Sequence, residues 1–135
     1  MQLRIAGALL IGLALLHLVF PRKFQWDIEL ARISPLNRQM FQVHCFFIAF
    51  VVFLQGILCA FFADALLQPS RLSRVVLAGL AWFWLARLFV QFFVYKSSLW
   101  RGNSFRTFVH IAFSLLWTYL CAVYLLAWWS LRGVQ

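Results

Sequence analysis

Residues 40–62 read MFQVHCFFIAFVVFLQGILCAFF and contain no charged side chain. A helix that crosses a bilayer needs about 20 consecutive, predominantly apolar residues, and this stretch meets that requirement. Asp64 follows it and marks its end. The stretch therefore predicts a transmembrane helix.

Three further stretches are predominantly apolar, at residues 3–20, 72–94 and 105–129, although each contains at least one arginine. Ser70 is suited to cap the third predicted span, because a serine hydroxyl accepts a hydrogen bond from a free N–H at a helix start. Gly102, Asn103 and Ser104 predict a turn before the fourth span. The first span resembles a signal peptide, but no small-residue cleavage site precedes Pro21, so we expect it to stay uncleaved. The sequence predicts one all-α transmembrane domain over residues 1–135, an integral membrane four-helix bundle.

Composition agrees with lipid as the solvent. Of the 135 residues, 65% are hydrophobic and only 11% are charged, whereas soluble domains carry about 25% charged residues. The formal net charge is +9, but the basic residues are scattered between the apolar stretches. Lysine and arginine at such positions set topology and meet anionic lipid headgroups. We therefore expect the bilayer as partner, and no nucleic acid.

Residues 21–39, between the first two spans, mix apolar and charged side chains irregularly. This mixture predicts a short amphipathic helix lying in the membrane interface and ending near Ser34 and Pro35. A solvated loop is the alternative.

The distribution of basic residues predicts the orientation, because cytoplasmic loops are enriched in lysine and arginine. The loops after the first and third spans hold seven, and the opposite side holds four. The seven are Arg22, Lys23, Arg32, Arg38, Lys96, Arg101 and Arg106; the four are Arg4, Arg71, Arg74 and Arg132. We expect these two loops in the cytoplasm and both termini on the extracytoplasmic (periplasmic) side.

All three histidines fall inside predicted spans. His17 lies near the end of the first, and His44 and His110 lie near the starts of the second and fourth. Since consecutive spans alternate in direction, the three are expected on one side of the membrane, roughly 5–8 Å below the interface. In the third span Arg87 and Gln91 share one helix face at a similar depth. Polar side chains at such depth usually face a bundle interior or a cavity.

Three imidazoles from three helices could ligate a transition metal such as Zn, Fe or Cu, and two could ligate haem b. Glu29 or Asp27 could complete the metal ligand set of His17, His44 and His110 or orient one of them. Arg87 and Gln91 would then bind an anionic group of the cofactor. Alternatively, each histidine bonds a neighbouring backbone carbonyl or a polar side chain and only holds helices together.

Three functions therefore stay open. The first is a membrane metal or haem protein with redox or hydrolytic chemistry near the cytoplasmic face. The second is a non-catalytic accessory or assembly subunit, with other membrane subunits or further copies of the chain as partners. The third is a small carrier or channel, disfavoured because the middle of each span is apolar. Gly7 and Gly12 lack the spacing of a GxxxG helix-packing motif.

Overall fold

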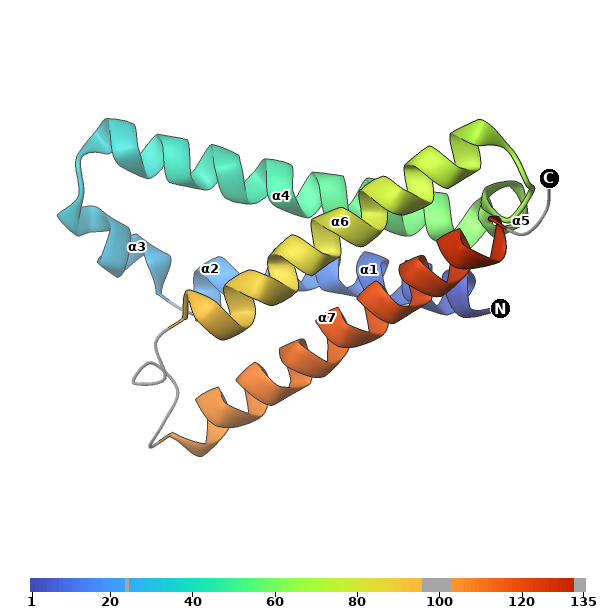
Figure 1. Cartoon of the computed structure of the whole chain (residues 1–135). Coiled ribbons are helices and arrows are strands. Elements are labelled where there is room, and N and C mark those ends of the chain that lie inside the picture. Colours follow the sequence, from blue (N-terminus) through green and yellow to red (C-terminus); the bar gives the residue numbers. More distant parts are fainter. Residues whose placement is uncertain (24, 96–102, 133–135) are drawn as a thin grey trace. The chain divides into compact units, whose positions relative to one another are not determined.

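A computed structural model describes residues 1–23, 25–95 and 103–132 (Figure 1). The described residues are helical, with no strand among them, which confirms the all-α prediction. The chain divides into two compact units, Met1–Ala63 and Asp64–Gln135. The first unit contains α1 (Gln2–Leu16), α2 (Phe20–Lys23), α3 (Trp26–Glu29), the 3-10 helix η1 (Leu30–Arg32) and α4 (Pro35–Phe61). The short helix α5 (Ala63–Leu66) leads into the second unit, with α6 (Arg71–Phe93) and α7 (Ser104–Ser130).

Three helices, α4, α6 and α7, are long and apolar enough to cross a membrane. The first predicted span is shorter than expected, because α1 ends at Leu16 after 15 residues and is only about 23 Å long. Pro21 explains the early end. In a continuous helix its ring would clash with the carbonyl of His17, four residues earlier. The chain turns instead, with the N–H of Leu18 bonded to the carbonyl of Leu15.

The segment between α1 and α4 is a series of short helical turns, so the prediction of one amphipathic helix is wrong. Gln25 has a left-handed backbone (φ 49°) and separates α2 from α3. The interruption near Ser34 is confirmed, but it begins the next helix. Ser34 Oγ accepts the N–H of Asn37 at 3.4 Å, and Pro35 occupies the first turn of α4. Proline is favoured there because its missing N–H would have no helical partner.

In the first unit α1 and α4 run antiparallel (Figure 1) and touch through their backbones. A Cβ atom added to Gly7 would lie 2.8 Å from the carbonyl oxygen of Gly56 and would also meet the backbone of Ala60. A Cβ atom on Gly56 would lie 2.9 Å from the nitrogen of Ile11. Gly56 and Ala60 form the small-xxx-small pattern that lets membrane helices approach closely. The close helix contact is therefore formed by Gly7 of α1 against Gly56 and Ala60 of α4. Gly12 has nothing within 4 Å of its Cβ position.

In the second unit α6 and α7 form an antiparallel pair (Figure 1). Ser70 caps α6, as predicted, by accepting the N–H of Ser73 at 3.0 Å. Ser73 Oγ also donates to the carbonyl of Ala65 at 3.0 Å, which ties α5 to α6. Asn103 caps α7, whereas Gly102 of the predicted turn lies outside the described residues. The buried apolar side chains of α6 and α7 are Leu77, Leu80, Ala81, Trp84, Trp117, Leu120, Cys121, Val123 and Tyr124.

Candidate functional site

A positively charged side chain lies within the apolar helix α6. The Arg87 guanidinium donates one hydrogen bond, from Nη1 to Gln91 Oε1 at 3.2 Å. Its carbon also lies 5.0 Å from the centroid of the Trp117 ring and 5.6 Å from that of Tyr95. A cation over an aromatic face is attracted by the ring quadrupole, typically by about 0.5–2 kcal/mol. None of these described partners of Arg87 carries a negative charge.

Gln91 connects Arg87 on α6 to His110 on α7. Its side chain is buried (4% exposed), and Gln91 Nε2 lies 2.9 Å from His110 Nδ1. The same amide nitrogen is 3.5 Å from the carbonyl oxygen of His110. The shared face of Arg87 and Gln91, predicted from their spacing, is therefore confirmed, and His110 joins them across the helix pair.

The directions of these hydrogen bonds set the charge on His110. An arginine can only donate, so the oxygen of the Gln91 amide must face Arg87. The amide nitrogen then faces His110 and donates, which requires an unprotonated Nδ1 that accepts. In this arrangement the ring proton of His110 is on Nε2, and the imidazole is neutral. We call the hydrogen-bonded series of Arg87, Gln91 and His110 the polar chain. It thus carries a single positive charge.

Trp117 forms the aromatic surface beside Arg87. Its ring stacks on Trp84 at a centroid distance of 5.0 Å and on Phe113 at 5.4 Å, both at interplanar angles of 21°. The side chain is 4% exposed, yet its Nε1–H has no hydrogen-bond partner among the described residues. A buried N–H group without an acceptor is destabilising by about 1–3 kcal/mol. An unpartnered donor therefore lies next to a cation that has only neutral partners.

The other two predicted histidine ligands lie in the first unit. His17 and His44 place Nδ1 at 2.8 Å from the Leu13 carbonyl and 2.7 Å from the Met40 carbonyl, each one turn earlier on the same chain segment. Since a carbonyl only accepts, each Nδ1 carries a proton, which leaves Nε2 as the nitrogen that could ligate a metal. Bonds to a backbone carbonyl are what we expect if the histidines have a structural role and do not bind a metal.

The common level predicted for the three histidines stays a prediction. The contacts of Gly7 with Ala60 and of Ile11 with Gly56 define the antiparallel register of α1 and α4. Neither contact involves His17 or His44. His44 is exposed, whereas His17 is half-buried.

No group of three His, Cys, Asp or Glu side chains able to hold a metal occurs in residues 1–23, 25–95 and 103–132. Glu29 is exposed at the end of α3, and Asp27 belongs to the same short helix. The ligand set of His17, His44, His110 and Glu29 therefore stays a prediction. What the structure does bring together is the pair predicted to bind an anionic group, Arg87 and Gln91, with His110.

Trp117 and Tyr95 were not predicted as site residues. A signal for Trp117 was available, since it lies seven residues after His110 and shares its helix face. Tyr95 follows Gln91 by one turn, but its position near the end of a span also fits the aromatic belt at a membrane interface.

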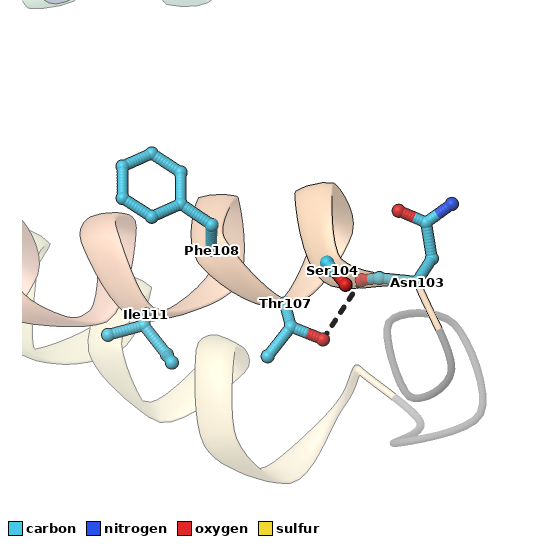
Figure 2. A pocket seen from close by; sticks show the side chains of 5 residues that line it. All are labelled: Asn103, Ser104, Thr107, Phe108 and Ile111. Carbon is cyan, nitrogen blue, oxygen red and sulfur yellow. Dashed lines mark hydrogen bonds between the residues drawn. The ribbon is translucent and has the colours of Figure 1, made fainter.

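A shallow hollow at the start of α7 does not contain these residues (Figure 2). Thr107 Oγ1 donates to the carbonyl oxygen of Asn103 at 3.0 Å, and Asn103 Oδ1 accepts the N–H of Arg106 at 3.0 Å. The polar groups of the hollow thus serve the first turn of the helix. Its lining residues, none of them charged, are Asn103, Ser104, Thr107, Phe108 and Ile111.

No protein-family model, no curated protein and no solved structure matches this chain. The chemistry of Arg87 and its neighbours is therefore the basis for a function.

Proposed function

We propose that this chain is an integral membrane protein that binds an anionic ligand at Arg87, between α6 and α7. One observation supports the proposal above all. A guanidinium lies within an apolar helix, and its described partners, Gln91, Trp117 and Tyr95, are all neutral. The proposal includes a four-helix bundle, in which α4, α6 and α7 cross the bilayer and α1 is inserted beside α4.

The energetics favour a negatively charged partner. Placing an arginine at the centre of a membrane helix is unfavourable by about 2.5–3.5 kcal/mol on insertion scales. The hydrogen bond that Arg87 donates to Gln91 and the two aromatic faces offset part of this. They leave the charge uncompensated and several guanidinium N–H groups available. A carboxylate or phosphate can accept two parallel N–H bonds from one guanidinium and neutralise it.

The depth of Arg87 fits a ligand that enters from one membrane surface. Arg87 precedes Phe93, the last residue of α6, by six residues, or about 9 Å. A long arginine side chain can direct its charge toward the nearer interface. This end of α6 leads into the loop that the distribution of basic residues predicts to be cytoplasmic, so we propose that the anionic group binds near the cytoplasmic face.

The test compares two arginines of the same helix. The purified chain in a mild detergent is titrated with oleate, and binding is followed by the quenching of tryptophan fluorescence or by native mass spectrometry. We expect Arg87→Gln to weaken binding at least tenfold. Arg71→Gln, at the exposed start of α6, is the matched control and should bind as the unchanged chain does. Equal binding by the Arg87 variant and the control would remove Arg87 from the site.

A second candidate function is ligation of a transition metal or haem b by His17 or His44. The observation in its favour is that each Nδ1 is held by a backbone carbonyl, which presents the Nε2 lone pair in the manner of many metal-binding histidines. An absorption spectrum and elemental analysis of the purified chain test this. A stoichiometric metal or a Soret band that is lost in His44→Ala would support it, and a metal-free, colourless protein would not.

A further inference from the structure

We infer that the ligand at Arg87 is a membrane-partitioned amphiphile whose headgroup carries one negative charge, such as a carboxylate or a phosphodiester. The inference rests on the proposed function and specifies its ligand. Three observations on α6 and α7 support it: the charge of the polar chain, the unpartnered indole N–H, and the apolar surface that flanks Arg87.

The charge of the site is the first observation. Gln91 is neutral, and its hydrogen bonds make His110 neutral as well. Arg87 therefore supplies the one positive charge of the polar chain. Among the described residues, the titratable groups beside this site on the same two helices or at their ends include Arg106, which is exposed one turn before His110, and Tyr95. In a site with little water, a monoanion forms a neutral pair with Arg87. A dianion would leave one charge both desolvated and uncompensated.

The available donors are the second observation. Arg87 uses one N–H on Gln91, and Trp117 Nε1–H has no acceptor among the described residues. The guanidinium carbon and the Trp117 ring centroid are 5.0 Å apart. The guanidinium thus lies over the face of the indole ring, and an oxygen-bearing headgroup beside it would lie near Trp117. The buried indole N–H becomes a second donor to a two-oxygen headgroup when that headgroup enters between α6 and α7.

The surface around Arg87 is the third observation. Phe83, one turn earlier on the same face of α6, is 43% exposed, and Val94, two turns later, is 59% exposed. Exposed apolar side chains on a membrane helix contact lipid chains. A ligand with a hydrocarbon tail can bury that tail along Phe83 while its headgroup reaches Arg87. A small hydrophilic anion would gain nothing from this surface and would lose its hydration.

The experiment uses four probes that share one oleyl chain, added to the full-length chain in mild detergent. Oleate and oleyl methyl phosphate carry one negative charge, oleyl phosphate carries about two near neutral pH, and oleyl alcohol carries none. We expect at least one of the two monoanions to bind about tenfold more tightly than both oleyl phosphate and oleyl alcohol. If both do, the site reads charge alone. If only one does, its headgroup identifies the source as a fatty acid or as a phospholipid-like diester.

Oleyl phosphate binding as tightly as the monoanions would overturn the inference but leave the proposed function intact. If no anionic probe binds more tightly than oleyl alcohol, the proposed function itself is refuted. Two variants of one residue check the charge argument. His110→Asn keeps a neutral acceptor for Gln91 and should preserve the preference. His110→Lys adds a second positive charge and should shift the preference toward oleyl phosphate by about tenfold. An unchanged order of affinities in a folded His110→Lys chain would contradict the argument.

Discussion

The contact of α1 with α4 makes a sharp prediction for two glycines of one helix. Gly7→Ala places a methyl group 2.8 Å from the carbonyl oxygen of Gly56 and against the backbone of Ala60. Ordinary contact begins near 3.4 Å, and the Ala60 backbone nitrogen is closer still than the Gly56 oxygen, so the helices must separate locally by more than about 0.6 Å and lose dispersion contacts. Because the obstacle is backbone, no side-chain rotation can relieve it. Such overpacking is destabilising by about 1–3 kcal/mol.

Alanine also favours a helix over glycine by about 1 kcal/mol, which offsets part of that loss. We therefore expect Gly7→Ala to lower the free energy of unfolding by about 1–2 kcal/mol. Gly12→Ala is the matched control, since nothing lies within 4 Å of its Cβ position. It should raise the free energy of unfolding by about 0.5–1 kcal/mol. Reversible unfolding by SDS in mixed micelles, followed by circular dichroism, measures both. A Gly7→Ala chain as stable as the Gly12→Ala chain would refute the close backbone contact.

Three further predictions concern the polar chain and use the same unfolding assay. Gln91→Leu leaves both Arg87 and His110 Nδ1 without their described hydrogen bond, so we expect a loss of about 2–4 kcal/mol. The double variant Arg87→Leu/Gln91→Leu should recover about 2 kcal/mol of the lost stability, because a charge without a hydrogen-bonding partner is removed from an apolar span. A further loss of stability would show that Arg87 stabilises the fold by itself. Trp117→Phe keeps the stacked ring but deletes the unpartnered N–H, so stability should be unchanged or higher by about 1 kcal/mol, while affinity for oleate should fall. Affinity equal to that of the unchanged chain would exclude the indole N–H as a ligand contact.

Features encoded by spacing along one helix could be predicted from the sequence. The i, i+4 pairing of Arg87 and Gln91 follows from helix periodicity, and Ser70 as a cap follows from the chemistry of the helix start. Three of the four predicted spans correspond to α4, α6 and α7, because a long apolar stretch in lipid must satisfy its backbone internally. The limits of α6 agree within one residue of the expected 72–94.

Contacts between two segments that lie far apart in the sequence could not be predicted from the pattern of either segment alone. The contact of Gly7 with Gly56 and Ala60 joins residues far apart in sequence, and no periodicity within α1 distinguishes Gly7 from Gly12. The end of the first span is a second case. The apolar stretch continues to Phe20, but the clash of Pro21 with the His17 carbonyl ends α1 at Leu16.

The two units achieve helix pairing by different physical means, and the difference bears on where function lies. α1 and α4 pair through small residues, with no charge at the contact, so nothing in that contact calls for a ligand. α6 and α7 pair through large aromatic rings and a buried amide that holds a cation in an apolar helix. Leucine at position 87 would pack in a bilayer at lower free energy. A residue that opposes stability in its own environment, supported by a partner that orients it, is expected where a ligand needs its charge. The position of Arg87 therefore supports the proposal of an anionic ligand more than a purely structural role for its charge.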